Sequence, residues 1–158
     1  MSTYFYESDI GKIGIAENDG KITNLYFLND ELPQELLICE TPILKEAAQQ
    51  LKSYLAGELT EFSLPLAPAG TAFMKQAWAS LCKIPYGKTA TYKEIAVEIG
   101  SPNAARAVGL ANNRNPIPVF IPCHRVIGAD GSLTGYRGGL ELKKRLLDME
   151  KIEKHADF

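Results

Sequence analysis

A cysteine, a histidine and an arginine follow one another at residues 123–125 and could perform nucleophilic chemistry. Cys123 comes directly after Pro122 and before His124 and Arg125. A thiol is a strong nucleophile only as the thiolate, and a neighbouring histidine or arginine lowers its pKa. The proline predicts that an extended segment ends here, which would present the cysteine at an edge. Free cysteines are also often buried and inert, so the spacing alone leaves both readings open.

Arg106 is a second candidate functional residue, in this case for binding a partner molecule. Ala104, Val108 and Ala111 recur at helical spacing and predict the packed side of a helix, while Arg106 points the other way with small alanines beside it. An arginine among such small residues can be pressed deep into a partner. A solvated arginine on an ordinary helix pair fits the same pattern, and both interpretations stay open.

The elements that position these residues are predicted to be mainly helical. Apolar residues at helical spacing predict four helices, over 73–81, 91–99, 102–112 and 140–150. Gly100 and Ser101 separate the second helix from the third, so this pair has the outline of a helix-turn-helix. Between the third and fourth helices, the apolar run 116–122 is bracketed by prolines and predicts one buried strand. A turn over 128–131 and a glycine-rich loop over 135–139 follow it.

The first third of the chain is predicted to form a small antiparallel sheet and one helix. Short β-rich segments predict strands over 3–7, 10–17 and 21–28. Asn18, Asp19 and Gly20 supply the turn residues of a hairpin between the last two strands. A helix is predicted over 42–59, with Thr41 as its N-cap. The whole chain is therefore expected to have an α+β fold.

A change in composition and charge predicts a domain boundary. The segment 62–70, FSLPLAPAG, reads as a linker. Residues 1–67 carry four lysines against eleven acids, a net charge of −7, whereas residues 68–158 carry thirteen basic residues against eight acids, a net charge of +5. We therefore expect a support domain over 1–67 and a domain over 68–158 that binds a polyanion such as nucleic acid.

The composition also excludes several classes of protein. The 158 residues are 46% hydrophobic and 23% charged, which is ordinary for a globular protein. No apolar run approaches the ~20 residues that span a membrane, and residues 1–7 do not resemble a secretory signal. Three widely spaced cysteines predict free thiols in a reducing, cytoplasmic compartment. With two histidines in the chain, we expect no zinc-ligand cluster and no other metal site. We also expect the protein to use no cofactor.

Three collinear motifs resemble one known family. They are TYKEIA over 91–96, NAARAVG over 103–109, and NPIPVFIPCHRVIGADGSLTGYRGG over 115–139. Together they are similar to the O6-alkylguanine-DNA alkyltransferases, also called methylated-DNA–protein-cysteine methyltransferases. The resemblance implies a ribonuclease-H-like N-terminal lobe and a C-terminal lobe with a winged-helix-like helix-turn-helix that binds DNA. It also implies stoichiometric transfer of an alkyl group from O6-alkylguanine, and from O4-alkylthymine, to Cys123 of a monomeric protein.

The same resemblance implies roles for individual residues. Cys123 would accept the alkyl group, His124 would relay a proton, and Glu150 would hold the histidine. Asn115 would bridge the preceding turn and the active site, and Tyr92 would crowd the target phosphate and donate to the base. The residues implied to contact DNA are Tyr92, Ala105, Arg106, Gly109 and Arg114, with Arg106 filling the space of the flipped nucleotide. Those implied to line the base pocket are Pro118, Val126, Tyr136 and Arg137.

The chain departs from the family pattern at one position, and two other functions remain to be weighed. Arg114 lies one position later than the basic residue of many relatives, so the resemblance does not by itself carry the phosphate contact over to it. One alternative function is a non-catalytic sensor of alkyl lesions with the same fold, although such proteins lack the acceptor cysteine. A second is a Cys-His hydrolase that turns over repeatedly, for which His155 is the other candidate base.

Overall fold

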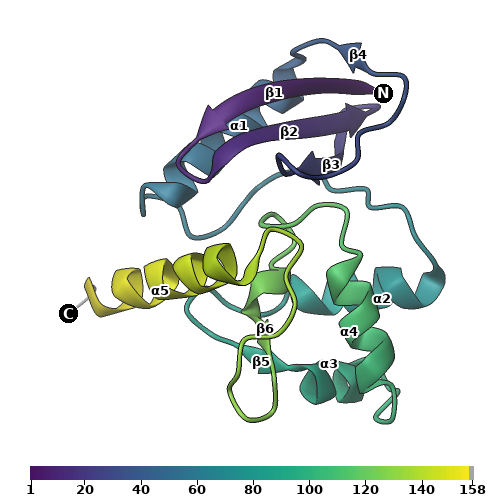
Figure 1. Ribbon diagram of the computed structural model, residues 1–158, viewed down its shortest axis with the longest axis vertical. Helices are drawn as coiled ribbons and strands as arrows, with labels where there is room; N and C mark the ends of the chain where they lie inside the picture. Colours follow the sequence, from purple (N-terminus) through teal and green to yellow (C-terminus); the bar gives the residue numbers. More distant parts are fainter. Residues whose placement is uncertain (157–158) are drawn as a thin grey trace. The chain divides into compact units, whose positions relative to one another are not determined.

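The computed structural model describes the backbone of residues 1–156 and the side chains of residues 1–151, so the side chain of His155 lies outside the described part. The chain divides into two compact units, Met1–Ala69 and Gly70–Phe158. The first unit contains a sheet and one helix, and the second is mainly helical (Figure 1). This arrangement confirms the predicted α+β fold.

The first unit is built on a four-stranded sheet in the order β3-β2-β1-β4. Its strands are β1 (Ser2–Ser8), β2 (Gly11–Asn18), β3 (Lys21–Tyr26) and β4 (Leu37–Ile38). The first three pair antiparallel, as expected, while the short β4, which the sequence did not indicate, pairs parallel to β1. Asp19 (φ 52°) and Gly20 (φ 78°) both adopt left-handed backbone and form the predicted tight turn between β2 and β3.

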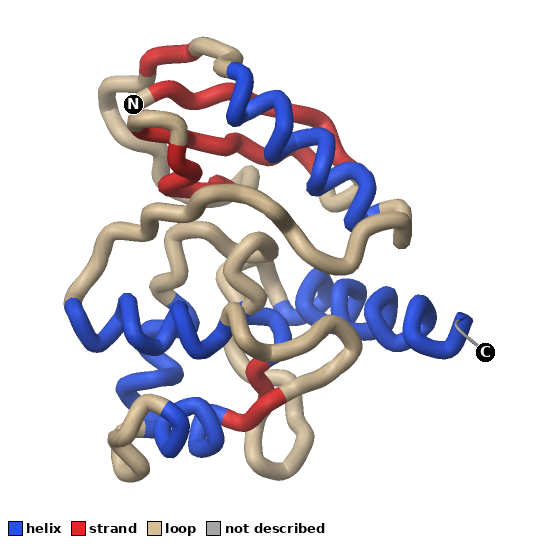
Figure 2. Tube along the Cα trace, turned by 180° about the vertical axis from the view of Figure 1, so that it is seen from behind, coloured by secondary structure: helices blue, strands red, loops and turns tan. Residues whose placement is uncertain are grey.

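Helix α1 (Pro42–Leu55) packs along one face of this sheet (Figure 2). Its buried residues recur at helical spacing: Leu44, Ala47, Leu51 and Tyr54. The helix ends four residues before the predicted end at residue 59. The reason is Gly57, whose φ of +78° is the left-handed conformation that terminates many helices.

The second unit begins with three helices: α2 (Ala72–Leu81), α3 (Tyr92–Glu98) and α4 (Ala105–Asn113). Helix α3 starts at a capping box, in which Thr91 accepts from the Glu94 backbone N–H and the Glu94 carboxylate accepts from the Thr91 N–H. Helix α4 begins at Ala105 rather than at residue 102, because the Ala104 N–H bonds to the Ser101 carbonyl and closes a turn first. The predicted helix-turn-helix pair is otherwise present.

The remaining elements of the second unit surround the cysteine. They are β5 (Ala90–Thr91), the 3-10 helix η1 (Cys123–Arg125), β6 (Val126–Ile127), which pairs parallel to β5, and α5 (Leu140–Ala156). Helix α5 continues six residues past the predicted end. Its buried side chains are Lys143, Leu146, Leu147 and Glu150, so this apolar helix side contains two charged residues.

Candidate active site

The segment before Cys123 is a buried turn, not the strand that was predicted over 116–122. The Ile121 N–H donates to the Ile117 carbonyl at 2.9 Å, so the chain doubles back on itself. Val119, at the tip, has a φ of +73°, a conformation that β-branched residues rarely adopt. Prolines in this run cannot donate to a strand ladder, which explains why the apolar pattern does not form one.

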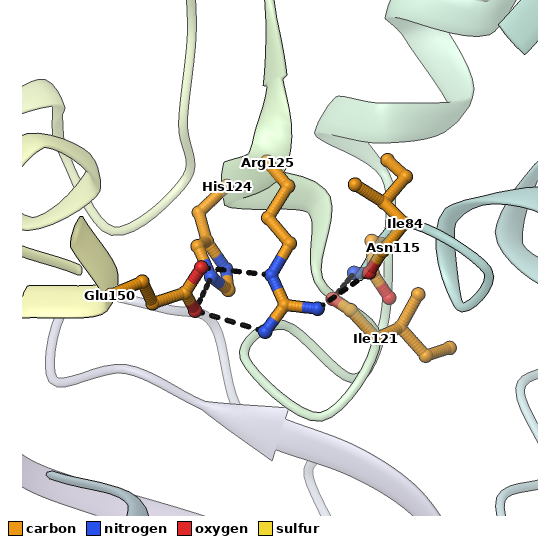
Figure 3. A network of polar contacts seen from close by, with 6 residues as sticks. All are labelled: Ile84, Asn115, Ile121, His124, Arg125 and Glu150. Carbon is orange, nitrogen blue, oxygen red and sulfur yellow. Dashed lines mark hydrogen bonds and ion pairs between the residues drawn. The ribbon is translucent and has the colours of Figure 1, made fainter. Parts of the chain in front are cut away.

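Asn115 holds this turn closed from inside. Its Oδ1 accepts from the Ile117 N–H and its Nδ2 donates to the Ile121 carbonyl, both at 2.9 Å. The Asn115 amide and the Ile121 carbonyl can be seen side by side in Figure 3. Asn115 is itself buried, so both bonds are shielded from water. The side chain therefore fixes the path of the backbone two residues before Cys123.

Cys123 is the first residue of η1 and is only 3% exposed. The expectation that it lies at a strand edge is therefore wrong, because the turn over 117–121 leads directly into a helical turn. Burial raises the pKa of the Cys123 thiol to about 11, against a hydrogen bond from Asn115 and the positive charges of Lys143 and Arg137, which lower it. The thiol is thus protonated at neutral pH until a base removes its proton.

His124 and Glu150 form a buried pair across 26 residues of sequence. His124 Nε2 lies 2.8 Å from Glu150 Oε2, and neither side chain is accessible to solvent beyond 1%. Burial lowers the pKa of His124, although the hydrogen bond and charge of Glu150 act in the opposite direction. Because an ionised Glu150 can only accept, Nε2 carries the proton it donates, and Nδ1 of the neutral ring is the basic nitrogen.

Glu150 is kept ionised in the interior by His124 together with Arg125. The guanidinium donates from Nε to Oε1 at 2.9 Å and from Nη2 to Oε2 at 3.0 Å, and its Nη1 donates to the Ile84 carbonyl at 2.8 Å (Figure 3). Burial alone would raise the pKa of Glu150, but its bonds and charge interactions with His124 and Arg125 outweigh burial and lower it to about 2. Sequence reasoning considered Arg125 only as a neighbour of the thiol.

Lys143 is a functional candidate that sequence reasoning missed. It is fully buried, and its Nζ donates to the Val126 carbonyl at 2.6 Å and to the Thr134 carbonyl at 2.9 Å. Its charge favours the thiolate of Cys123. Residues 143, 146, 147 and 150 follow the spacing of one helix side. That spacing was the available signal, but a lysine is not expected on an apolar side.

The residues implied to contact DNA lie on α3 and α4. Tyr92 begins α3, and its hydroxyl lies 2.5 Å from Thr134 Oγ1. Gly109 lies against the same ring, since a Cβ added there would be 3.8 Å from Tyr92 Cδ1. Arg106 is exposed near the start of α4, with half-buried Ala105 before it, and Arg114 is exposed at its C-cap. The two arginines lie about 12 Å apart along the helix axis, from the rise per residue.

The residues implied to line the base pocket do not share one environment. Pro118, Val126 and Tyr136 are buried, whereas Arg137 is exposed. Thr134, which sequence reasoning missed, connects the loop that carries Tyr136 to two helices, because its hydroxyl contacts Tyr92 and its carbonyl accepts from Lys143. Thr134 therefore links this loop to both α3 and α5.

Two kinds of feature are not found among the described residues. No group of three or more histidine, cysteine or acidic side chains is arranged to hold a metal ion in that part of the chain. In the same part, no helix is long and apolar enough to cross a membrane.

Two family models together match almost the whole chain. The 6-O-methylguanine DNA methyltransferase ribonuclease-like domain matches residues 1–68, and the DNA binding domain of the same methyltransferase matches residues 72–152. The chain belongs to the 6-O-methylguanine DNA methyltransferase family. The resemblance seen in its motifs is thereby confirmed.

Individual members of this methyltransferase family are similar to the chain over most of their length. A methylated-DNA–protein-cysteine methyltransferase of Methanosarcina barkeri is 54% identical, covering 92% of this chain and 94% of the relative. The constitutive enzyme of that name from Bacillus subtilis is 47% identical, covering 92% and 93%. Among solved structures, the chain is similar to that in the crystal structure of Mycobacterium tuberculosis OGT in complex with DNA. The two sequences are 45% identical, and the structures superpose with a TM-score of 0.92 over 97% of this chain and 94% of that one.

Proposed function

We propose that this protein repairs DNA by moving the alkyl group of O6-alkylguanine, and of O4-alkylthymine, onto Cys123, once per molecule. The observation that carries the assignment to this residue is a buried thiol whose ionised form Asn115 and Lys143 favour. The next residue in the chain is His124, which is paired with Glu150. Family membership supports the reaction class. The protein is a methylated-DNA–[protein]-cysteine S-methyltransferase, and each molecule is inactivated by the one transfer it performs.

The chemical step is a displacement at the alkyl carbon. The sulfur of Cys123 forms a bond to that carbon while the bond from carbon to the guanine O6 breaks, and its electrons go to the base. The base leaves as an anion and takes up a proton, for which Tyr92 is the proposed donor. The thioether formed on Cys123 is a poor leaving group, so no second turnover follows.

The thiol proton is proposed to leave toward His124. Because burial keeps Cys123 protonated, a base must act as the alkyl carbon approaches. The Nδ1 of His124 is the basic nitrogen of the ring, and the negative charge of Glu150 stabilises the imidazolium that forms. Arg125 positions the carboxylate from its other side.

DNA binding is proposed to occur through α3 and α4, with the damaged nucleotide turned out of the duplex. A modified base inside the stack is out of reach of any side chain, so it must be extruded. Arg106 would take its place in the duplex. Small residues at Ala105 and Gly109 would let the backbone approach DNA closely, and Arg114 would contact a phosphate. The proposed base pocket consists of Pro118, Val126, Tyr136 and Arg137.

We further propose that residues 1–67 form a support domain and residues 68–158 the functional domain of a monomeric, cytoplasmic protein. The free thiols of Cys39 and Cys82, both exposed, support a reducing compartment. The net positive charge of residues 68–158 fits a domain that binds DNA.

Intact-mass measurement tests the proposed function. We expect the protein to gain one methyl group after incubation with duplex DNA carrying O6-methylguanine, and peptide mapping to place it on Cys123. Cys82→Ser, at an exposed cysteine, is the matched control and should still be methylated. DNA binding without a mass change would favour the lesion sensor, and many products per protein would favour a hydrolase.

A further inference from the structure

Asn112 connects the last turn of α4 to the backbone of the acceptor cysteine. Its side chain is buried, and its Nδ2 donates to the Cys123 carbonyl at 3.2 Å. The other end of the amide, Oδ1, is also buried and has no hydrogen-bond partner among the residues that the structure describes. This amide thus makes one long hydrogen bond inside the protein.

Such an arrangement does not favour stability. A buried acceptor without a donor destabilises the folded state. The Cys123 carbonyl, for its part, also accepts from the Val126 N–H, so it keeps a donor without Asn112. A leucine branches at the same carbon as asparagine, leaves no buried acceptor unpaired and favours helix more strongly. On stability alone, an apolar residue at 112 would be at least as good.

The position of Asn112 suggests what the amide does instead. The preceding carbonyl, that of Ala111, accepts from Trp78 Nε1 at 2.8 Å, which fastens this turn of α4 to α2. From this fixed turn Asn112 reaches to η1, and the same helix carries Arg106 on its exposed side. One hydrogen bond therefore fixes the backbone of Cys123 relative to α4, the helix that is proposed to bind DNA.

We propose that Asn112 is a positioning residue that aligns Cys123 with the DNA-binding helix. This inference rests on the proposed function, since alignment matters only if α4 delivers the base to the thiol. Without the bond, η1 is free to shift relative to α4 and to Asn115 and Lys143. A displacement near 1 Å can slow a positioned reaction by about a hundredfold. The thiolate would also lose part of its stabilisation.

The test compares Asn112→Leu with a control that removes a similar group elsewhere. Ser80 Oγ, in α2, is likewise buried and without a partner in the described part of the chain. Three quantities are measured for Asn112→Leu and Ser80→Ala: unfolding by urea, followed by the fluorescence of Trp78; methyl transfer from saturating duplex; and alkylation of Cys123 by iodoacetamide, mapped by mass. Asn112→Ala, which removes the donor without added bulk, guards against misfolding.

We expect Asn112→Leu to be as stable as the parent or more stable, to transfer at least tenfold more slowly, and to react at least threefold more slowly with iodoacetamide at pH 8. Asn112→Ala should show the same slowing, and Ser80→Ala should be as stable as the parent with both parent rates. Parent rates in both Asn112 variants would overturn the proposal. The proposal would also be overturned if both Asn112 variants were less stable than the parent and their transfer rates fell in step with that loss, because Asn112 would then have a structural role. If the parent itself is not methylated, the proposed function fails, and the iodoacetamide rates still decide whether Asn112 positions the thiol.

Discussion

Replacing Glu150 by glutamine should destabilise the protein by an amount that the structure predicts. The pKa of this carboxyl falls from 4.5 to about 2 on folding, which at 1.36 kcal/mol per unit corresponds to about 3 kcal/mol. An independent argument agrees, because breaking a buried ion pair costs about 3–5 kcal/mol by leaving the partner charge alone. In Glu150→Gln that stranded charge is Arg125, whose guanidinium makes two bonds to the carboxylate.

The pH dependence gives this prediction its sign. The folded pKa of Glu150 is depressed, so its contribution is fully present above pH 4.5 and is lost as pH falls toward 2. The gap between parent and Glu150→Gln should therefore be about 3 kcal/mol at pH 7 and smaller by about 2 kcal/mol at pH 3. Urea unfolding at both pH values measures it, and Trp78, the one tryptophan, reports on the second unit.

A control on the same helix separates this effect from a general change of charge. Asp148 pairs with Lys144 at 2.7 Å, but both side chains are largely exposed. Water and salt screen a pair this exposed, so Asp148→Asn should be nearly neutral at both pH values. A Glu150→Gln gap below about 1 kcal/mol, or one that does not change with pH, would refute the reasoning that starts from the buried ion pair.

Further substitutions test the chemistry and the DNA contact. Glu150→Gln should also slow methyl transfer at least tenfold with little loss of DNA affinity, and equal rates would mean that the acid does not act on His124. Cys123→Ser should abolish transfer yet keep DNA binding, measured by gel shift, because the alkoxide is far harder to form than the thiolate. Arg106→Ala should slow transfer from saturating duplex while largely sparing the free modified base, which needs no flipping; equal loss on both would make Arg106 structural. Lys143→Met should raise the pKa of Cys123, seen as a shift to higher pH in its rate of alkylation, and an unchanged profile would contradict that role.

Much of the fold and the reaction class could be predicted from sequence because their signals are local. A helix shows its packed side every three to four residues, and Asp19-Gly20 reveal a tight turn because few residues adopt left-handed backbone. The motif around Cys123 is contiguous, so the family could be identified from it. The pair of Glu150 with His124 was expected through that resemblance, and the structure brings the two side chains together.

The tertiary structure decided what depends on partners distant in sequence. The apolar run before Cys123 could have been a strand, and it became a turn because Asn115 bonds to two of its backbone groups. Lys143 is buried because two carbonyls from other segments accept from its ammonium group. A charge can be buried only where hydrogen-bond partners surround it, and the periodicity of one helix does not show whether other segments supply them. The sequence therefore determined which residues could react, and packing decided which charges surround the thiol.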